Sequence, residues 1–170
     1  MVAIVYFFID LCALRRAPQD LPTSSALLGL VLVAGLISSW LLALASQAPP
    51  WLGLVQGGLD FALMLGVLLL ALKAVGTPMR FTQTATALVG AKTWIGLIAL
   101  LPLRLAVSAD ETSTQLLIAG ILFLALVVWS VVVTAHILRH AFEIPFIQCV
   151  FIAITYDILS FILISGVTIR

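Results

Sequence analysis

Five long apolar segments take up most of this sequence, at about residues 23–46, 51–74, 81–103, 114–138 and 146–168. Each has the length of about 20 residues that an α-helix needs to cross the hydrocarbon core of a bilayer. Inside a bilayer, every backbone N–H and C=O group must find its hydrogen bond within the protein, which favours helices. The sequence therefore predicts an all-α integral membrane protein, a bundle of about five transmembrane helices.

The composition excludes a water-soluble fold. Of the 170 residues, 64% are hydrophobic and 9% are charged, whereas a soluble domain has about 25% charged residues. The polar connections are too short for a separate domain, so residues 1–170 form a single polytopic membrane domain. The eight Lys and Arg residues are scattered, which argues against nucleic acid as a partner.

Residues 1–16 precede the first crossing and are predicted to form an interfacial or re-entrant helix. Their apolar run is broken by Asp10, and no basic residue precedes it, as one would in a secretory signal peptide. Two prolines then end this segment. The N-cap oxygen of the first crossing is expected to come from Thr23, Ser24 or Ser25.

Proline also marks the later boundaries. Pro49 and Pro50 form a turn between the first two crossings, and Pro145 begins the fifth. Pro102 lies near the end of the third crossing, where it is expected to kink or end the helix.

The positive charges between the crossings predict the orientation. One side carries Arg15, Arg16, Lys73, Arg80 and Arg139, and the other carries Arg104 and Arg170 beside Asp110 and Glu111. We therefore expect a cytoplasmic N-terminus and a C-terminus outside, in the inner (plasma) membrane of a bacterial cell.

Three charged residues lie inside the predicted crossings: Asp60, Lys92 and Asp157. With a rise of 1.5 Å per residue, all three fall at nearly the same depth, about 13–18 Å from the helix ends. Charges at this depth are costly, so they usually face the bundle and find partners. We expect Lys92 to bridge Asp60, Asp157 or both.

This intramembrane charge cluster has two interpretations. As a proton or ion relay it would exchange a proton when its surroundings change. As a fixed ion pair it would only set the helix register. The sequence favours the structural role, because Gln56, Gln83 and Tyr156 supply only fragments of the polar path that a relay needs.

Small residues recur at helical spacing on two crossings. They are Gly53 and Gly57 on the second crossing, and Thr82, Thr86 and Gly90 on the third. Such stripes let helices approach closely, so both are predicted to be helix-packing surfaces.

A polar group ends the fourth crossing at the cytoplasmic rim: His136, Arg139, His140 and Glu143. Two histidines four residues apart could ligate a metal. The favoured interpretation is that these cations complement the helix C-terminus and anchor it among lipid head groups, with no metal bound.

Part of the sequence resembles a known family. Phe81-Thr82-Gln83-Thr84 opens an apolar helix that reaches Pro102, Val128-Trp129-Ser130 precedes His136-Ile137-Leu138, and the last helix contains Tyr156. Over about 75–170 this pattern resembles bacterial members of the Yip (Ypt-interacting protein) domain family, and over 15–75 only the helix order agrees. The resemblance implies a five-helix domain with a cytoplasmic N-terminus and a non-enzymatic role.

No motif for catalysis is present: the sequence lacks a GxSxG elbow, an HExxH pair and a glycine-rich phosphate loop. We therefore expect no enzyme and no cofactor. The predicted function is that of a non-catalytic accessory or assembly protein, a scaffold that binds other integral membrane proteins and lipids laterally, with a homo-oligomer as a further option. The alternative is a small transporter or proton- or ion-conducting protein built on the intramembrane charge cluster.

Overall fold

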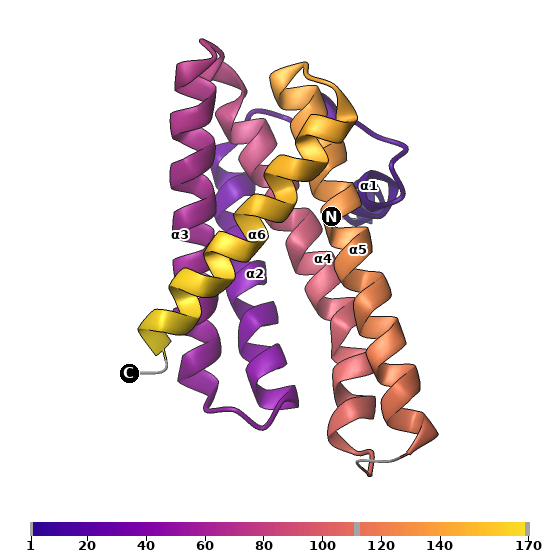
Figure 1. Cartoon of the computed structure of the whole chain (residues 1–170). Coiled ribbons are helices and arrows are strands. Elements are labelled where there is room, and N and C mark those ends of the chain that lie inside the picture. Colours follow the sequence, from indigo (N-terminus) through magenta and orange to yellow (C-terminus); the bar gives the residue numbers. More distant parts are fainter. Residues whose placement is uncertain (1, 111–112, 169–170) are drawn as a thin grey trace.

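The computed structural model describes residues 2–110 and 113–168, and in this part of the chain all regular structure is helical (Figure 1). Within these described residues, five helices are long and apolar enough to cross a membrane. In chain order the elements are α1 (Val2–Cys12), the 3₁₀ turn η1 (Pro18–Asp20), α2 (Ser25–Ala45), α3 (Pro50–Ala74), the 3₁₀ turn η2 (Pro78–Arg80), α4 (Phe81–Val107), α5 (Thr114–Phe142) and α6 (Phe146–Thr168). Glu111 and Arg170, used above for orientation, lie outside the described residues.

The long helices alternate in direction, so their connections gather at two ends of the bundle (Figure 1). We call the end with connections 75–80 and 143–145 the basic end, because Lys73, Arg80 and Arg139 lie there. The opposite end has the α2–α3 turn at 46–49 and the α4–α5 connection.

Helix starts follow the predicted capping chemistry. Ser24 is the N-cap of α2, and its Oγ accepts a hydrogen bond of 3.2 Å from the Leu27 N–H. Ser113 caps α5 in the same way through the Leu116 N–H. Each hydroxyl satisfies an N–H group that would otherwise lack a partner.

Two helices extend a few residues beyond the ends expected from the sequence. Pro102 lies inside α4, which continues to Val107, because a proline removes one backbone hydrogen bond while the turns around it keep theirs. α5 continues past residue 138 to Phe142 and ends at Glu143, whose left-handed backbone (φ 57°) stops the helix.

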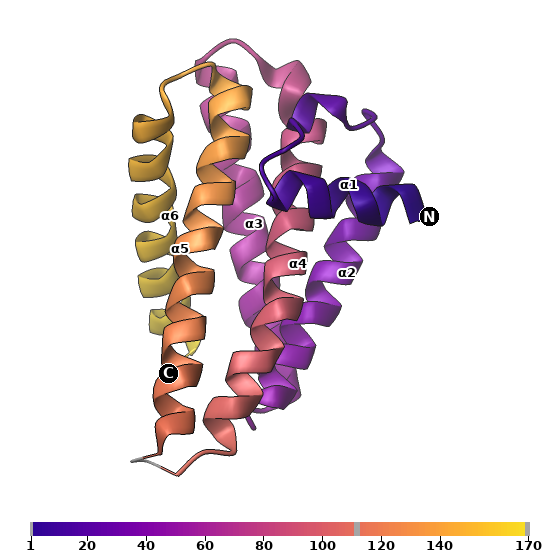
Figure 2. The same ribbon diagram turned by 90° about the vertical axis from the view of Figure 1, so that its right-hand side faces the viewer.

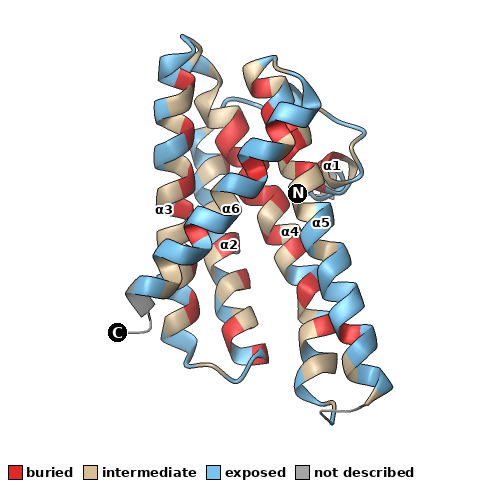
Figure 3. Ribbon diagram, in the orientation of Figure 1, coloured by how far each residue is buried: buried red, intermediate tan, exposed pale blue. Residues whose placement is uncertain are grey.

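α4 is the central helix of the bundle. All residues from 84 to 91 are buried, and α4 contacts α1, α2, α3 and α5 (Figure 3). Its buried threonines cost little because their hydroxyls donate to backbone carbonyls one turn back, for example Thr86 Oγ1 to Thr82 O at 2.7 Å. Around it, α2 packs on α3 and α5 on α6, and α6 crosses in front of α2 and α3 in the view of Figure 1.

Gly53 and Gly57 lie at a contact between two helices of this chain, α3 and α2. A Cβ at Gly53 would lie 2.5 Å from the Ser39 carbonyl oxygen, and one at Gly57 would lie 2.5 Å from the Ser39 hydroxyl. These two glycines therefore set the close approach of α3 to α2. Their face is covered by this chain's own helix and is closed to another protein.

α1 lies across the bundle rather than along it (Figure 2). The ring of Phe8 packs directly on Gly90 of α4, about 14 Å along that helix from its start. The predicted stripe of Thr82, Thr86 and Gly90 thus receives α1 at Gly90, while Thr86 is fully buried. α1 thus contacts α4 about two to three turns from the start of that helix.

We expect Gly90→Leu to displace α1. A side chain at this position would overlap the Phe8 ring, which is buried and has little room to move, and such overpacking costs about 1–3 kcal/mol. Trypsin should then cleave after Arg15 and Arg16 faster than in the wild-type protein in detergent. Gly120→Leu is the matched control, since no atom lies within 4 Å of its Cβ position. Equal cleavage of both variants would mean that this contact does not hold α1.

Candidate functional site

The predicted contact between Lys92 and Asp60 is present as an ion pair. Lys92 Nζ lies 2.8 Å from Asp60 Oδ2, and the two side chains are 21% and 23% exposed. Asp60 is about 15 Å from the start of α3, and Lys92 about 16 Å from the start of α4. The pair therefore lies near the middle of both helices, where an unpaired charge would cost about 2.5–3.5 kcal/mol in a bilayer.

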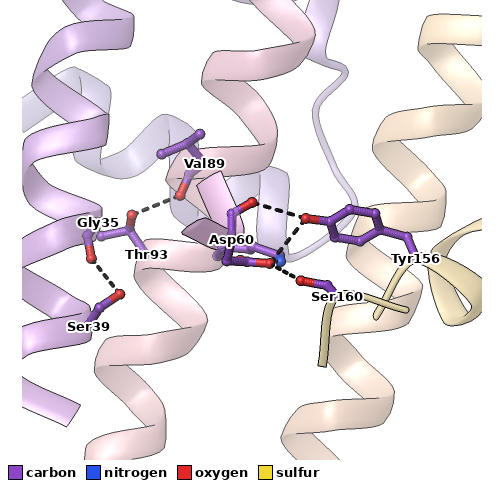
Figure 4. A network of polar contacts seen from close by, with 8 residues as sticks. Gly35, Ser39, Asp60, Val89, Thr93, Tyr156 and Ser160 are labelled. Atoms are coloured by element: carbon purple, nitrogen blue, oxygen red, sulfur yellow. Dashed lines mark hydrogen bonds and ion pairs between the residues drawn. The ribbon is translucent and has the colours of Figure 1, made fainter. Parts of the chain in front are cut away.

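Two side chains of α6 complete the coordination of Asp60 (Figure 4). Ser160 Oγ donates to Asp60 Oδ1 at 2.7 Å, and Tyr156 Oη donates to the same oxygen at 3.1 Å. The Lys92 ammonium also lies 5.1 Å from the centre of the Tyr156 ring, within cation–π range. This network of Asp60, Lys92, Tyr156 and Ser160 fastens α3, α4 and α6 together at one depth.

The carboxylate of Asp157 has fewer partners than that of Asp60. It is half-buried, and within residues 2–110 and 113–168 its carboxylate forms no hydrogen bond and no ion pair. Lys92 attracts it electrostatically, but the Lys92 ammonium is bonded to Asp60. The sequence allowed Lys92 to pair with Asp60, with Asp157 or with both, and in the structure Lys92 pairs with Asp60.

A cavity of about 590 Å³ joins the two carboxylates. Its walls come from α2 to α6 and are mostly apolar, with Ser39, Gln56, Asp60, Asp157 and Ser160 among the polar side chains. It extends to Ser46 and Ala48 at the α2–α3 turn, so it leads from Asp60 towards the opposite end of the bundle. We call it the carboxylate cavity. A smaller cavity of about 260 Å³ adjoins it and is lined by both Asp60 and Lys92.

A second large cavity lies on the other side of the network. It has a volume of about 390 Å³, and Lys92 and Tyr156 form part of its wall. The rest of the lining is almost entirely apolar and extends to Val75, Phe142 and Ile144 at the basic end. We call it the apolar cavity. Lys92 and Tyr156 thus lie between a cavity directed towards one end of the bundle and a cavity directed towards the other.

The rim residues His136, Arg139, His140 and Glu143 belong to the last turns of α5 and to its cap. His136 Nε2 contacts the Arg16 carbonyl oxygen at 3.0 Å, and Arg80 Nη2 pairs with Glu143 at 2.6 Å. Arg80 also donates to the Ala141 carbonyl at 3.3 Å, which satisfies a group at the helix C-terminus. These contacts tie α5 to the N-terminal segment and to the start of α4. Among the described residues, no group of three His, Cys, Asp or Glu side chains could hold a metal.

Sequence reasoning missed several residues of this site. Ser39 was not expected on the cavity wall, and neither Tyr156 nor Ser160 was predicted to bind Asp60. The α6 pair had a signal, since positions 156, 157 and 160 share one face of a helix at the depth of Asp60. Ser39 had none, because a serine in an apolar helix usually bonds its own backbone, as it does here to Gly35 O at 3.1 Å.

Comparison with known proteins adds no relative to this picture. No family model, no curated protein and no solved structure matches this chain.

Proposed function

We propose that this chain is a small membrane protein of the transport class, which carries a solute or a proton past Asp60, Lys92 and Asp157. One observation supports this most: the charged network has a cavity on either side, and each cavity is lined by at least one of its members. Transporters commonly bind their substrates near the bilayer midplane, between helices. An ion pair that only fixed helix register would need neither the carboxylate cavity nor the second carboxylate on its wall.

The proposed setting is the inner membrane of a bacterium, with the basic end in the cytoplasm. This orientation follows from Lys73, Arg80 and Arg139 at that end. The carboxylate cavity would then open to the outside, and the apolar cavity would face the cytoplasm. The resemblance to the Yip domain family remains a hypothesis that agrees with this orientation.

Cysteine accessibility tests whether the carboxylate cavity is filled with water. Ala99 lines it, whereas its neighbour Ile98 is 52% exposed on the outer surface of the bundle, in the position of a lipid contact. The background chain has both native cysteines replaced by alanine. In the wild-type chain, burial raises the pKa of the Cys12 thiol to about 11, so this thiol would react only slowly with the reagent at neutral pH. We expect Ala99→Cys to react with a membrane-impermeant charged thiol reagent added to intact cells, and Ile98→Cys to remain unlabelled.

The two positions are adjacent in the chain and differ only in the face of α4 they occupy, so the comparison isolates the cavity. Only a thiol in water can ionise and react. An Ala99→Cys variant as unreactive as Ile98→Cys would mean a dry cavity, and the structural interpretation of the ion pair would replace transport.

An accessory role is the second candidate, and a different surface favours it. Gly58, Ala62 and Gly66 follow one another at four-residue spacing on α3, and no chain atom lies within 4 Å of a Cβ at either glycine. Such a stripe allows close approach of another transmembrane helix. This stripe lies on a different face of α3 from Gly53 and Gly57. The face with Gly53 and Gly57, which the sequence had indicated, is already covered by α2.

Affinity purification from native membranes in a mild detergent tests this second candidate. If the stripe binds a partner, stoichiometric membrane proteins, or a second copy of this chain, should co-purify with the wild type. The variant Ala62→Phe should lose them, because a large side chain prevents close helix approach. A wild-type protein that purifies as a monomer without partners would count against the accessory role.

A further inference from the structure

The charges at the centre of the bundle do not balance. Asp60 and Asp157 supply two carboxylates to the carboxylate cavity, and among the described residues that line it or the adjoining cavity of about 260 Å³, only Lys92 supplies an amine. Asp60 has its counter-charge at 2.8 Å and two hydroxyl donors besides. Asp157, on the wall of the carboxylate cavity, has none of these in the described part of the chain. The cavity therefore has the potential of a site for one positive charge.

The size and lining of the cavity indicate what kind of cation would fit. At about 590 Å³ it lies within the range of small-molecule pockets, roughly 300–1,000 Å³, and is far larger than a bare ion requires. Its walls are largely apolar, with hydroxyl groups from Ser39 and Ser160. Phe123 and Phe161 add aromatic rings, which attract organic cations. Two carboxylates alone are also a poor ligand set for a divalent metal, which takes six or more oxygens.

We infer that the carboxylate cavity binds a singly charged organic cation, with its charged group on Asp157 and its apolar body between α2, α3 and α6. Lys92 keeps Asp60 neutralised, so Asp157 alone provides the attraction. This inference rests on the proposed function and names the chemical class of its substrate. Entry is from the α2–α3 turn, where the cavity reaches Ser46 and Ala48.

Binding of tetraphenylphosphonium to the purified protein in detergent, measured by equilibrium dialysis, tests this inference. The wild type should bind it saturably at one site. Asp157→Asn, which removes the charge and keeps the shape, should weaken binding by about tenfold or more. Asp110→Asn in the exposed α4–α5 connection is the matched control and should bind as the wild type does. Absence of saturable binding to the wild type, or equal affinity of Asp157→Asn, would overturn the inference.

A second measurement leaves Asp157 in place, in case the Asn variant fails to fold. Tetraphenylphosphonium should protect Ala99→Cys from the thiol reagent, whereas tetraphenylborate, which has the same shape and the opposite charge, should not. Equal protection by both ions, or by neither, would overturn the inference. Labelling of Ala99→Cys without any cation binding would reject the organic cation and leave the proposed transport function standing with a different substrate.

Discussion

Replacement of Lys92 by methionine is expected to destabilise the protein by about 3–5 kcal/mol, because it leaves Asp60, whose side chain is only 23% exposed, without its counter-charge. Asp157 loses the same attraction, so both carboxylates are left without a cation. Asp60→Asn should be milder, since the Lys92 ammonium can then turn towards Asp157. The free energy of unfolding can be followed by tryptophan fluorescence in detergent.

The double variant Asp60→Asn with Lys92→Met separates the ion pair from general damage to the bundle. Removing both charges should recover most of the stability lost in Lys92→Met, because an uncompensated charge costs more than a missing pair. If the double variant is as unstable as Lys92→Met alone, the loss comes from packing, and the ion pair does not stabilise the fold.

Two glycines five residues apart on α3 should respond to alanine in opposite directions. At Gly53 the new Cβ would lie 2.5 Å from a backbone oxygen of Ser39, which cannot turn away as a side chain could. Gly53→Ala should therefore separate α2 from α3 and cost about 1–3 kcal/mol. At Gly58 the Cβ position is open, and Gly58→Ala should stabilise the helix by up to about 1 kcal/mol.

Thermal unfolding of the two variants beside the wild type checks this pair. Equal melting temperatures for Gly53→Ala and Gly58→Ala would show that α2 and α3 leave room for a Cβ at Gly53, which would contradict the close contact with Ser39. A destabilised Gly58→Ala would instead point to a helix that covers the stripe of Gly58, Ala62 and Gly66 in the assembled protein.

The helices could be predicted from the sequence because the bilayer length requirement and the proline-containing turns act locally. The helix ends were less predictable where two local signals compete. Pro102 suggested a kink or an end, and α4 continues through it to Val107, since the apolar residues that follow still favour helix inside a membrane. α5 extends to Phe142 because its last carbonyls find Arg80, a residue 61 positions earlier in the sequence.

The depth of the charge cluster was also predictable, because depth follows from residue number at a fixed rise per residue. The choice between Asp60 and Asp157 as partner of Lys92 was not. Both lie at the same depth, and the choice depends on how far each helix is rotated about its axis, which tertiary packing determines. The cavities depend on the spacing between helices, so no local pattern indicated them.

The small-residue stripes show the same limit. Gly53, Gly57 and Gly90 lie at contacts between helices, but a period of four residues in the sequence does not say which helix fills the groove. Here α2 and α1 of the same chain fill it. The stripe that remains open, on the other face of α3, has the same spacing and differs only in what surrounds it.

Charge movement across proteoliposomes on a solid support tests the central claim most directly, namely that a positive charge passes between the two cavities at Asp60, Lys92 and Asp157. Rapid steps in proton or tetraethylammonium concentration supply the driving force. The wild type and Asp110→Asn should give a transient current for at least one of these cations, and Asp157→Asn should give none. Currents no larger than those of protein-free liposomes for both cations, from protein shown to be folded, would contradict the transport function.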